Sequence, residues 1–289
     1  MADFEERRWT SRDGLRLFAR DYAGSGGEAR LPVICLHGLT RNSKDFEDVA
    51  PRLADGGRRV LAIDIRGRGQ SDRDPVPARY QPITYARDVL ALMDQLGIAR
   101  AQVLGTSMGG IIAMTIFGLR PRAIAGAILN DVGPEVSPAG VARIVGYAGK
   151  GEAVESWEDA VAYVRRKNEV AFPDYGTDDW RRFAERTFRE GPHAPELDYD
   201  PAIAGPLRAT PPRFAGLAAW LTFRRLARRR PVLLVRGATS DIVTREIAEK
   251  MRRRCPSLGV AEIPGVGHAP MLTEPEAVEA IDKYLARVP

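Results

Sequence analysis

Residues 102–112 read Gln-Val-Leu-Gly-Thr-Ser-Met-Gly-Gly-Ile-Ile and join an apolar run to the start of a helical pattern. The apolar run ends at Leu104, and the helical pattern continues to Leu119. Ser107 stands between glycines two residues before it and two residues after it, which let the chain pass closely on both sides of a sharp turn. We therefore expect a strand, a strained turn with Ser107 at its apex, and a helix whose N-terminal amides point towards the serine.

The same succession of apolar runs and helical patterns recurs along the chain. Short apolar runs typical of buried parallel strands occupy residues 33–36, 60–63, 102–104, 124–129, 232–235 and 259–263. Helical patterns occupy residues 43–53, 84–96, 107–119, 215–227, 245–253 and 274–285. A β-hairpin is expected at the start, with strands at 7–10 and 15–20 around an Asp-Gly turn. This alternation predicts an α/β fold with a parallel sheet covered on both faces.

One stretch interrupts the alternation. From about residue 133 to residue 213 there is no strong strand signal, while residues 157–170 and 178–189 have helical patterns. A segment of this length is too long for an ordinary connection between neighbouring elements. We expect a helical cap insertion at 133–213 and a core domain made of residues 1–132 and 214–289.

A serine hydroxyl becomes a good nucleophile when a base takes its proton, and the chain contains 3 histidines. His268 lies in a glycine-rich loop between the last predicted strand and the last predicted helix, where its imidazole can be presented to a cleft. His193, beside a proline in the predicted cap, is expected on the surface, and His37 is expected to have a structural role. We therefore predict Ser107 as nucleophile and His268 as its base.

The carboxylate that holds the imidazole has two candidates. Asp241 follows the strand at 232–235, and Asp131 comes just after the strand at 124–129. The order serine, acid, histidine with the acid on the strand before the histidine favours Asp241. Asp131 is the alternative acid, with capping of the loop that enters the cap as its other interpretation. The backbone N–H groups of Leu39 and Met108 are the candidates for an oxyanion hole.

Together these residues resemble the α/β-hydrolase family across nearly the whole chain. The resemblance rests on His37-Gly38, residues 105–110, the Gly-Ala-Thr-Ser-Asp segment ending at Asp241, and residues 267–270. Residues 64–71 are similar to a turn of that family, and they lack the third glycine of a dinucleotide-binding loop. Residues 37–48 are similar to a bacterial esterase- or lactonase-like subgroup. The resemblance implies an α/β-hydrolase fold with a mostly parallel eight-stranded sheet and an inserted helical cap.

The resemblance also implies a serine hydrolase that works through an acyl-enzyme and needs no cofactor and no metal. We expect the substrate to be a carboxylic ester of a small molecule, since simple esters need least beyond the triad and the oxyanion hole. A lactonase and a carbon–carbon bond hydrolase of aromatic-degradation intermediates remain alternatives, as does a non-catalytic small-molecule binder on the same fold. A serine at position 107 argues against epoxide hydrolases and haloalkane dehalogenases, which need an aspartate there.

Four aromatic residues are candidate walls of a substrate pocket. Trp220 and Phe223 lie on the predicted helix before residue 232, and Phe172 and Tyr175 lie in the predicted cap. Aromatic side chains in such positions also serve simply to pack a cap onto a core, and this alternative stays open.

Composition narrows the remaining classes of protein. The chain of 289 residues has a net charge of +5, but its arginines are interleaved with acids along the sequence, so no nucleic-acid partner is expected. No apolar run is long enough to span a bilayer, and the first residues lack the apolar core of a signal peptide. We expect a cytoplasmic protein with no membrane partner, two free thiols at Cys35 and Cys255, and a small-molecule substrate. The sequence leaves the oligomeric state open.

Overall fold

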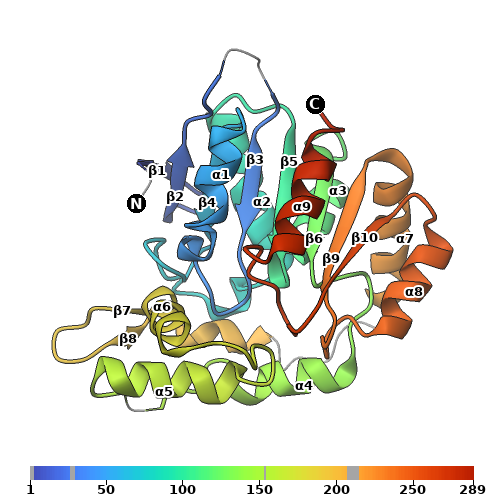
Figure 1. Cartoon of the computed structure of the whole chain (residues 1–289). Coiled ribbons are helices and arrows are strands. Elements are labelled where there is room, and N and C mark those ends of the chain that lie inside the picture. The colour runs from blue at the N-terminus through green and yellow to red at the C-terminus, as the bar shows by residue number, and fades with distance from the viewer. Residues whose placement is uncertain (1–2, 27–29, 153, 207–214) are drawn as a thin grey trace.

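A computed structural model describes residues 3–26, 30–152, 154–206 and 215–289. Its centre is an eight-stranded sheet in the order β1-β2-β4-β3-β5-β6-β9-β10 (Figure 1). The strands are β1 Glu5–Thr10, β2 Arg16–Tyr22, β3 Val33–Leu36, β4 Val60–Asp64, β5 Ala101–Thr106, β6 Ile124–Asn130, β9 Val232–Gly237 and β10 Gly259–Ile263. The predicted α/β-hydrolase fold with its mostly parallel eight-stranded sheet is confirmed.

The sheet is antiparallel at one edge and parallel elsewhere. β1 pairs with β2 in the predicted hairpin, and β2 pairs antiparallel with β4. The other neighbours are parallel, so β3, β4, β5, β6, β9 and β10 all end at the same edge. The central strands β3 to β6 are buried along their length, which explains why they are apolar on both faces. Loops that follow these strands therefore meet above one edge, where sites form in open α/β sheets.

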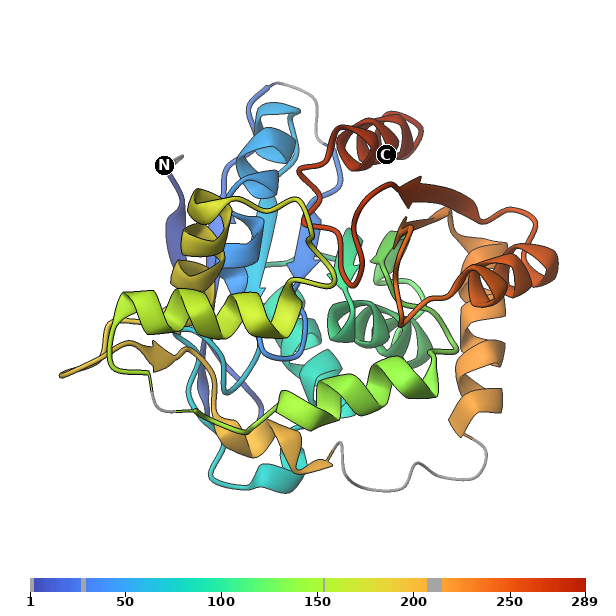
Figure 2. The same ribbon diagram turned by 60° about the horizontal axis from the view of Figure 1, so that its bottom comes forward.

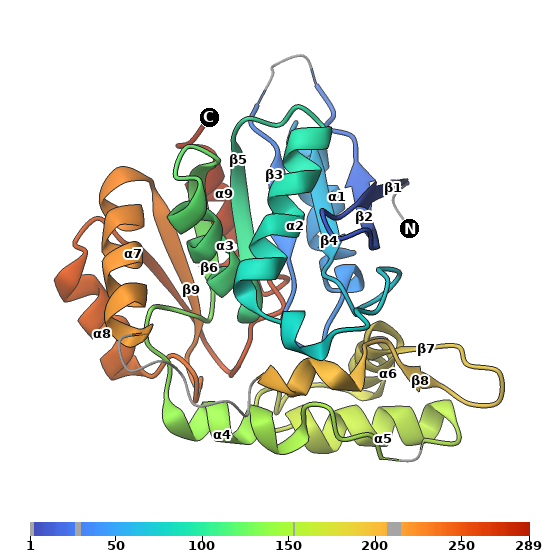
Figure 3. The ribbon, with the colours of Figure 1, turned by 180° about the vertical axis from the view of Figure 1, so that it is seen from behind.

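Helices cover both faces of the sheet. On one face lie α1 Val49–Asp55 and α9 Pro275–Leu285, with the short 3-10 helix η1 Ser43–Phe46 before α1 (Figure 1). On the other lie α2 Pro82–Gln95, α3 Met108–Leu119 and α7 Ala215–Arg229, with α8 Arg245–Arg254 beside them (Figure 3). A further 3-10 helix, η2, spans Pro77–Arg79 before α2. The helical patterns found in the sequence correspond to these elements.

The segment after β6 forms a layer across the carboxyl edge of the sheet (Figure 2). It contains α4 Pro138–Tyr147, α5 Trp157–Asn168, α6 Thr177–Thr187, the two-stranded sheet of β7 Phe188–Arg189 and β8 Glu196–Leu197, and η3 Pro201–Ala204. α5 and α6 were expected from the sequence, whereas α4 and the small sheet were not. The layer has an aromatic core of its own around Phe172 and Trp180. We call it the cap; the domain boundary predicted between residues 213 and 214 lies outside the described residues.

Two properties of the described residues bear on earlier expectations. Cys35 and Cys255 are both buried free thiols. Among the helices of the described part of the chain, none is both long and apolar enough to cross a membrane.

Candidate active site

Ser107 lies at the apex of the predicted strand-to-helix turn. Its backbone has φ 51° and ψ −115°, a region that costs a non-glycine residue energy and that clusters at functional sites. Gly105 and Gly109 allow this turn, because a Cβ on Gly109 would collide with the carbonyl of Leu36 and one on Gly105 with the backbone of Gly109. The Ser107 amide is held by the carbonyl of Asn130 at 2.9 Å. The hydroxyl is thereby raised above the carboxyl edge of the sheet.

His268 reaches Ser107 from the loop between β10 and α9. Its Nε2 lies 2.9 Å from Ser107 Oγ, within hydrogen-bond distance. Two contacts fix the loop: the Asn130 side chain donates to the carbonyl of Pro270 at 2.8 Å, and the Gly267 amide donates to the carbonyl of Ala171 in the cap at 2.7 Å. The other two histidines lie elsewhere, with His193 exposed in the cap and His37 fully buried.

The carboxylate beside His268 is Asp131, the alternative acid. Its Oδ2 lies 2.7 Å from His268 Nδ1, and its side chain is fully buried. The same oxygen accepts a hydrogen bond from Ser240 Oγ at 2.5 Å, and Oδ1 accepts one from the Gly237 amide at 3.3 Å. These donors come from the end of β9 and the turn after it, so β9 holds the acid that β6 supplies. Ser240 was not singled out in the sequence.

The prediction that Asp241 holds the imidazole is wrong. Its carboxylate forms a two-pronged ion pair with Arg143 of α4, at 2.6 and 2.8 Å. The hydrogen bonds from Arg143 hold the pKa of Asp241 below its usual range. Asp241 lies four residues beyond the end of β9, far enough along the turn to face the cap. Asp131 instead comes directly after the last residue of β6, with its backbone at φ 52°.

The amides of Leu39 and Met108 flank the same serine from two elements. Met108 is the first residue of α3, and Leu39 belongs to the loop after β3. Within the part of the chain that the structure describes, neither amide donates a hydrogen bond to a protein acceptor. Free N–H groups at a helix start and in an adjoining loop are the usual parts of an oxyanion hole. The geometry is thus compatible with the predicted pair of donors.

His37 orients the loop that carries Leu39. The Ile65 amide donates to His37 Nε2 at 3.1 Å, which leaves the proton on Nδ1. Nδ1 then donates to the carbonyl of Gly38 at 2.7 Å. Burial lowers the pKa of His37 to about 3, so the ring is neutral at physiological pH. This agrees with the structural role expected from its position.

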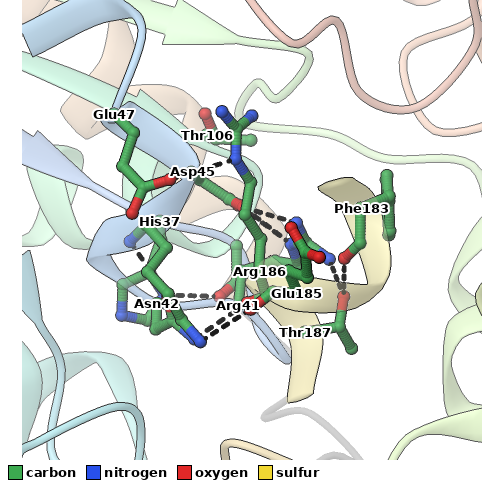
Figure 4. Close-up of polar contacts among 12 residues, drawn as sticks. His37, Arg41, Asn42, Asp45, Glu47, Thr106, Phe183, Glu185, Arg186 and Thr187 are labelled. Carbon is green, nitrogen blue, oxygen red and sulfur yellow. Dashed lines mark hydrogen bonds and ion pairs between the residues drawn. The ribbon is translucent and has the colours of Figure 1, made fainter. Parts of the chain in front are cut away.

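Residues of α6 in the cap contact Arg41 and Asn42, which continue this loop (Figure 4). Arg41 pairs with Asp45, lies over the ring of Phe183 at 4.1 Å and donates to the hydroxyl of Thr187. Asn42 Nδ2 donates to the carbonyl of Arg186 at 3.0 Å. The end of α6 is therefore fastened to the residues that follow the candidate oxyanion donor.

A small cavity of about 110 Å³ lies between Ser107, His268 and the cap. Five aromatic residues of the cap lie in its wall: Tyr147, Tyr163, Phe172, Phe183 and Tyr199. Burial raises the pKa of each of the three tyrosines, so their phenols stay protonated and able to donate. Lys167 also lines the cavity, while Arg166 and Lys167 share the single carboxylate of Glu152 at 2.7 and 2.6 Å.

The predicted pocket residues divide between this cavity and the core. Phe172 lines the cavity, and Tyr175 stacks behind it with ring centroids 4.6 Å apart. The prediction for Trp220 and Phe223 is wrong, since both belong to α7 and are buried in the core, and Trp220 donates to Glu135 at 3.1 Å. They lie on a helix that covers the sheet face and not on its carboxyl edge. Tyr147 and Tyr199 were missed because α4 and the residues after β8 gave no clear pattern in the sequence, and Tyr163 was missed although its helix, α5, was predicted.

Comparison with known proteins gives consistent matches. A model of the alpha/beta hydrolase family matches residues 33–281. A 3-hydroxybutyrate-oligomer hydrolase from Cupriavidus necator is 35% identical, with 94% of this chain and 93% of that protein covered. A 2-(acetamidomethylene)succinate hydrolase from Mesorhizobium japonicum is 27% identical over 88% of this chain and 87% of its own length. The crystal structure of an alpha/beta hydrolase from Novosphingobium aromaticivorans has a TM-score of 0.91 at 43% identity, covering 100% of both chains.

Proposed function

Because the chain belongs to the alpha/beta hydrolase family, we propose that it is a serine esterase that cleaves a small carboxylic ester through an acyl-enzyme. The observation that carries the proposal is the continuous chain of hydrogen bonds from Ser107 through His268 to Asp131. In such a chain the acid fixes the ring tautomer and the imidazole is free to take the serine proton. The hydrolase relatives support the general reaction and leave the substrate open.

The proposed reaction has two halves. Ser107 Oγ attacks the ester carbonyl while His268 Nε2 takes its proton, and the Leu39 and Met108 amides stabilise the negative oxygen of the tetrahedral intermediate. His268 then gives that proton to the leaving alkoxide, which departs as the alcohol. A water molecule attacks the acyl-enzyme with His268 again as base, and collapse of the second intermediate releases the carboxylic acid and restores the serine. Asp131 holds the ring and stabilises the imidazolium in both halves.

For the substrate we propose a short ester that ends in a carboxylate, with 3-hydroxybutyrate oligomers as the first compounds to test. A relative that matches over 93% of its length is named a 3-hydroxybutyrate-oligomer hydrolase. The small cavity, with three tyrosines and two phenylalanines of the cap in its wall, suits a short acyl group. Lys167 brings a positive charge to the cavity wall that suits a carboxylate end group. We include the cytoplasmic location in this proposal, to be tested by cell fractionation.

Hydrolysis of p-nitrophenyl acetate and labelling by a fluorophosphonate test the reaction. We expect the unaltered protein to be active and labelled, and Ser107→Ala to lose labelling and about six orders of magnitude in kcat. Ser257→Ala, an exposed serine whose hydroxyl donates to the carbonyl of Ala227, is the matched control and should keep full activity. Near-full activity of Ser107→Ala would contradict the proposal, and a folded protein that is neither active nor labelled would indicate a non-catalytic binder.

A substrate panel tests the finer part of the proposal. It contains 3-hydroxybutyrate dimer and trimer, neutral short esters, γ-lactones and dienoic ketones, compared by kcat/KM. The highest kcat/KM is expected for the hydroxybutyrate esters. Preference for the lactones or the ketones would replace esterase activity by lactone opening or carbon–carbon cleavage on the same three residues.

A further inference from the structure

Arg68 lies in the turn after β4, directly behind the candidate oxyanion hole. Its side chain is buried, with 1% of the residue exposed. Nε donates to the carbonyl of Leu39 at 3.0 Å, and Nη2 lies 3.6 Å from the sulfur of Met108. Nη1 donates to the carbonyl of Arg66 at 2.8 Å and to the hydroxyl of Tyr85 at 3.0 Å. One guanidinium therefore touches both residues whose amides flank Ser107.

The positive charge of Arg68 is balanced by a different set of partners from that of its neighbour Arg66. Arg66 is equally buried and binds three carboxylates, those of Asp13, Asp74 and Asp88. For Arg68, the described residues provide no carboxylate within ion-pair distance, and its partners are carbonyls, a phenol, a sulfur and the ring faces of Tyr80 and Tyr85. A buried charge without a counter-ion is expensive and marks a site where the charge has a use.

The contacts of Arg68 and His37 fix the two peptide planes on either side of Leu39. His37 holds the carbonyl of Gly38, which belongs to the same peptide unit as the Leu39 amide. In a trans peptide the N–H points opposite to the carbonyl, so this contact directs the Leu39 N–H away from His37. Arg68 holds the carbonyl of Leu39, which belongs to the next peptide unit. Since a guanidinium donates in a rigid planar fork, the same group that holds this carbonyl also packs against the side-chain sulfur of Met108 at the start of α3.

We propose that Arg68 is a positioning residue that fixes the loop carrying the Leu39 amide for the oxyanion and places a positive charge behind the Leu39 and Met108 amides. The inference rests on the proposed function, because it concerns the transition state of acyl transfer. The positive charge of Arg68 interacts with the negative charge that develops on the oxyanion and only weakly with the neutral ester. Loss of Arg68 should therefore lower kcat and leave KM nearly unchanged.

The test compares Arg68→Met and Arg68→Lys with Arg87→Met, which removes one exposed positive charge from α2. kcat and KM are measured on p-nitrophenyl acetate and expressed per active site titrated with a fluorophosphonate. In Arg68→Met we expect kcat to fall about 100-fold with KM within about 3-fold. Arg68→Lys keeps the charge and loses the fork, so it should lose about 10-fold in kcat. Arg87→Met should match the unaltered protein.

Binding of a trifluoromethyl ketone separates positioning from a purely structural role. Ser107 adds to this ketone and leaves a negative oxygen in the oxyanion hole, so its affinity should fall in step with kcat in both Arg68 variants. A fall in melting temperature with unchanged kcat per titrated site would overturn the inference, as would a loss confined to KM. If Arg68→Met does not fold, Arg68→Lys decides alone, and full activity in it would overturn the inference. Absence of both hydrolysis and labelling in the unaltered protein would overturn the proposed function as well.

Discussion

Two conservative substitutions, Asp131→Asn and Asp241→Asn, test which acid serves His268. Asp131 is fully buried and accepts hydrogen bonds from the His268 ring, the Ser240 hydroxyl and the Gly237 amide. An asparagine has nearly the same shape, but its amide can donate to His268 Nδ1. The ring then carries its proton on Nε2 and cannot accept the proton of Ser107. The expected loss in kcat is about 10⁴-fold, or about 5 kcal/mol of transition-state stabilisation.

Asp241→Asn removes a well-formed ion pair with Arg143 and no contact with His268. The pair of Asp241 with Arg143 is partly exposed, with 40% and 35% of the two side chains accessible. Such pairs contribute about 0–1 kcal/mol to stability, so the melting temperature should fall by a few degrees at most. kcat per active site should stay within about 3-fold of the unaltered protein, because His268 keeps its acid.

The assay is steady-state hydrolysis of p-nitrophenyl acetate at pH 7.5, with thermal unfolding followed for each variant. Folded protein in both variants makes the comparison of kcat direct. The reasoning is refuted if Asp241→Asn loses about 10⁴-fold and Asp131→Asn keeps most of its activity, since the acid would then lie on the turn after β9. Similar large losses in both would show that the Arg143 contact also shapes the site.

Three further predictions concern other parts of the molecule. The folded pKa of His37 is about 3 and its unfolded pKa is 6.5, so neutral His37 stabilises the fold fully above pH 6.5. This contribution to the free energy of unfolding falls by about 2 kcal/mol as the pH is lowered to 5. Urea unfolding of His37→Gln should lack this pH dependence. Phe223→Ala should lower the free energy of unfolding in urea by about 3–5 kcal/mol and leave kcat per titrated site unchanged. A changed substrate preference would instead indicate that Phe223 lines the substrate pocket. Lys167→Met should lower kcat/KM about tenfold on 3-hydroxybutyrate trimer and hardly at all on p-nitrophenyl acetate; equal effects on both esters would contradict carboxylate recognition.

The fold could be predicted from the sequence because its signals are local. Apolar runs such as residues 33–36 and 232–235 are buried throughout as β3 and β9. The glycines around Ser107 report a close approach of backbones that only one kind of turn needs. The cap was harder, since its short strands and α4 have weak patterns and depend on contacts with the core. Gly140 shows this dependence, because a Cβ there would collide with the carbonyl of Asp241.

The choice of acid could not be made from local signals. β6 and β9 are neighbours in the sheet, and the Asp131 amide donates to the carbonyl of Val235 at 2.7 Å. Asp131 and Asp241 are thus far apart in sequence, yet both lie at one edge of the sheet near His268. Chain order favoured Asp241 and says nothing about where each side chain points. The available signal was that Asp131 directly follows the last residue of β6, whereas Asp241 lies four residues beyond the end of β9.

The position of the acid on β6 leaves the turn after β9 available for a second task. A histidine needs a carboxylate at one place above the sheet, and neighbouring strands reach that place equally well. With Asp131 there, Ser240 supports it, and Asp241 is able to bind Arg143. The same turn receives α4 through a hydrogen bond from the Ser137 amide to the carbonyl of Ile242 at 2.9 Å. One short segment therefore holds the acid on one side and the cap on the other, so a shift of α4 that changed the cavity would also act on the support of Asp131.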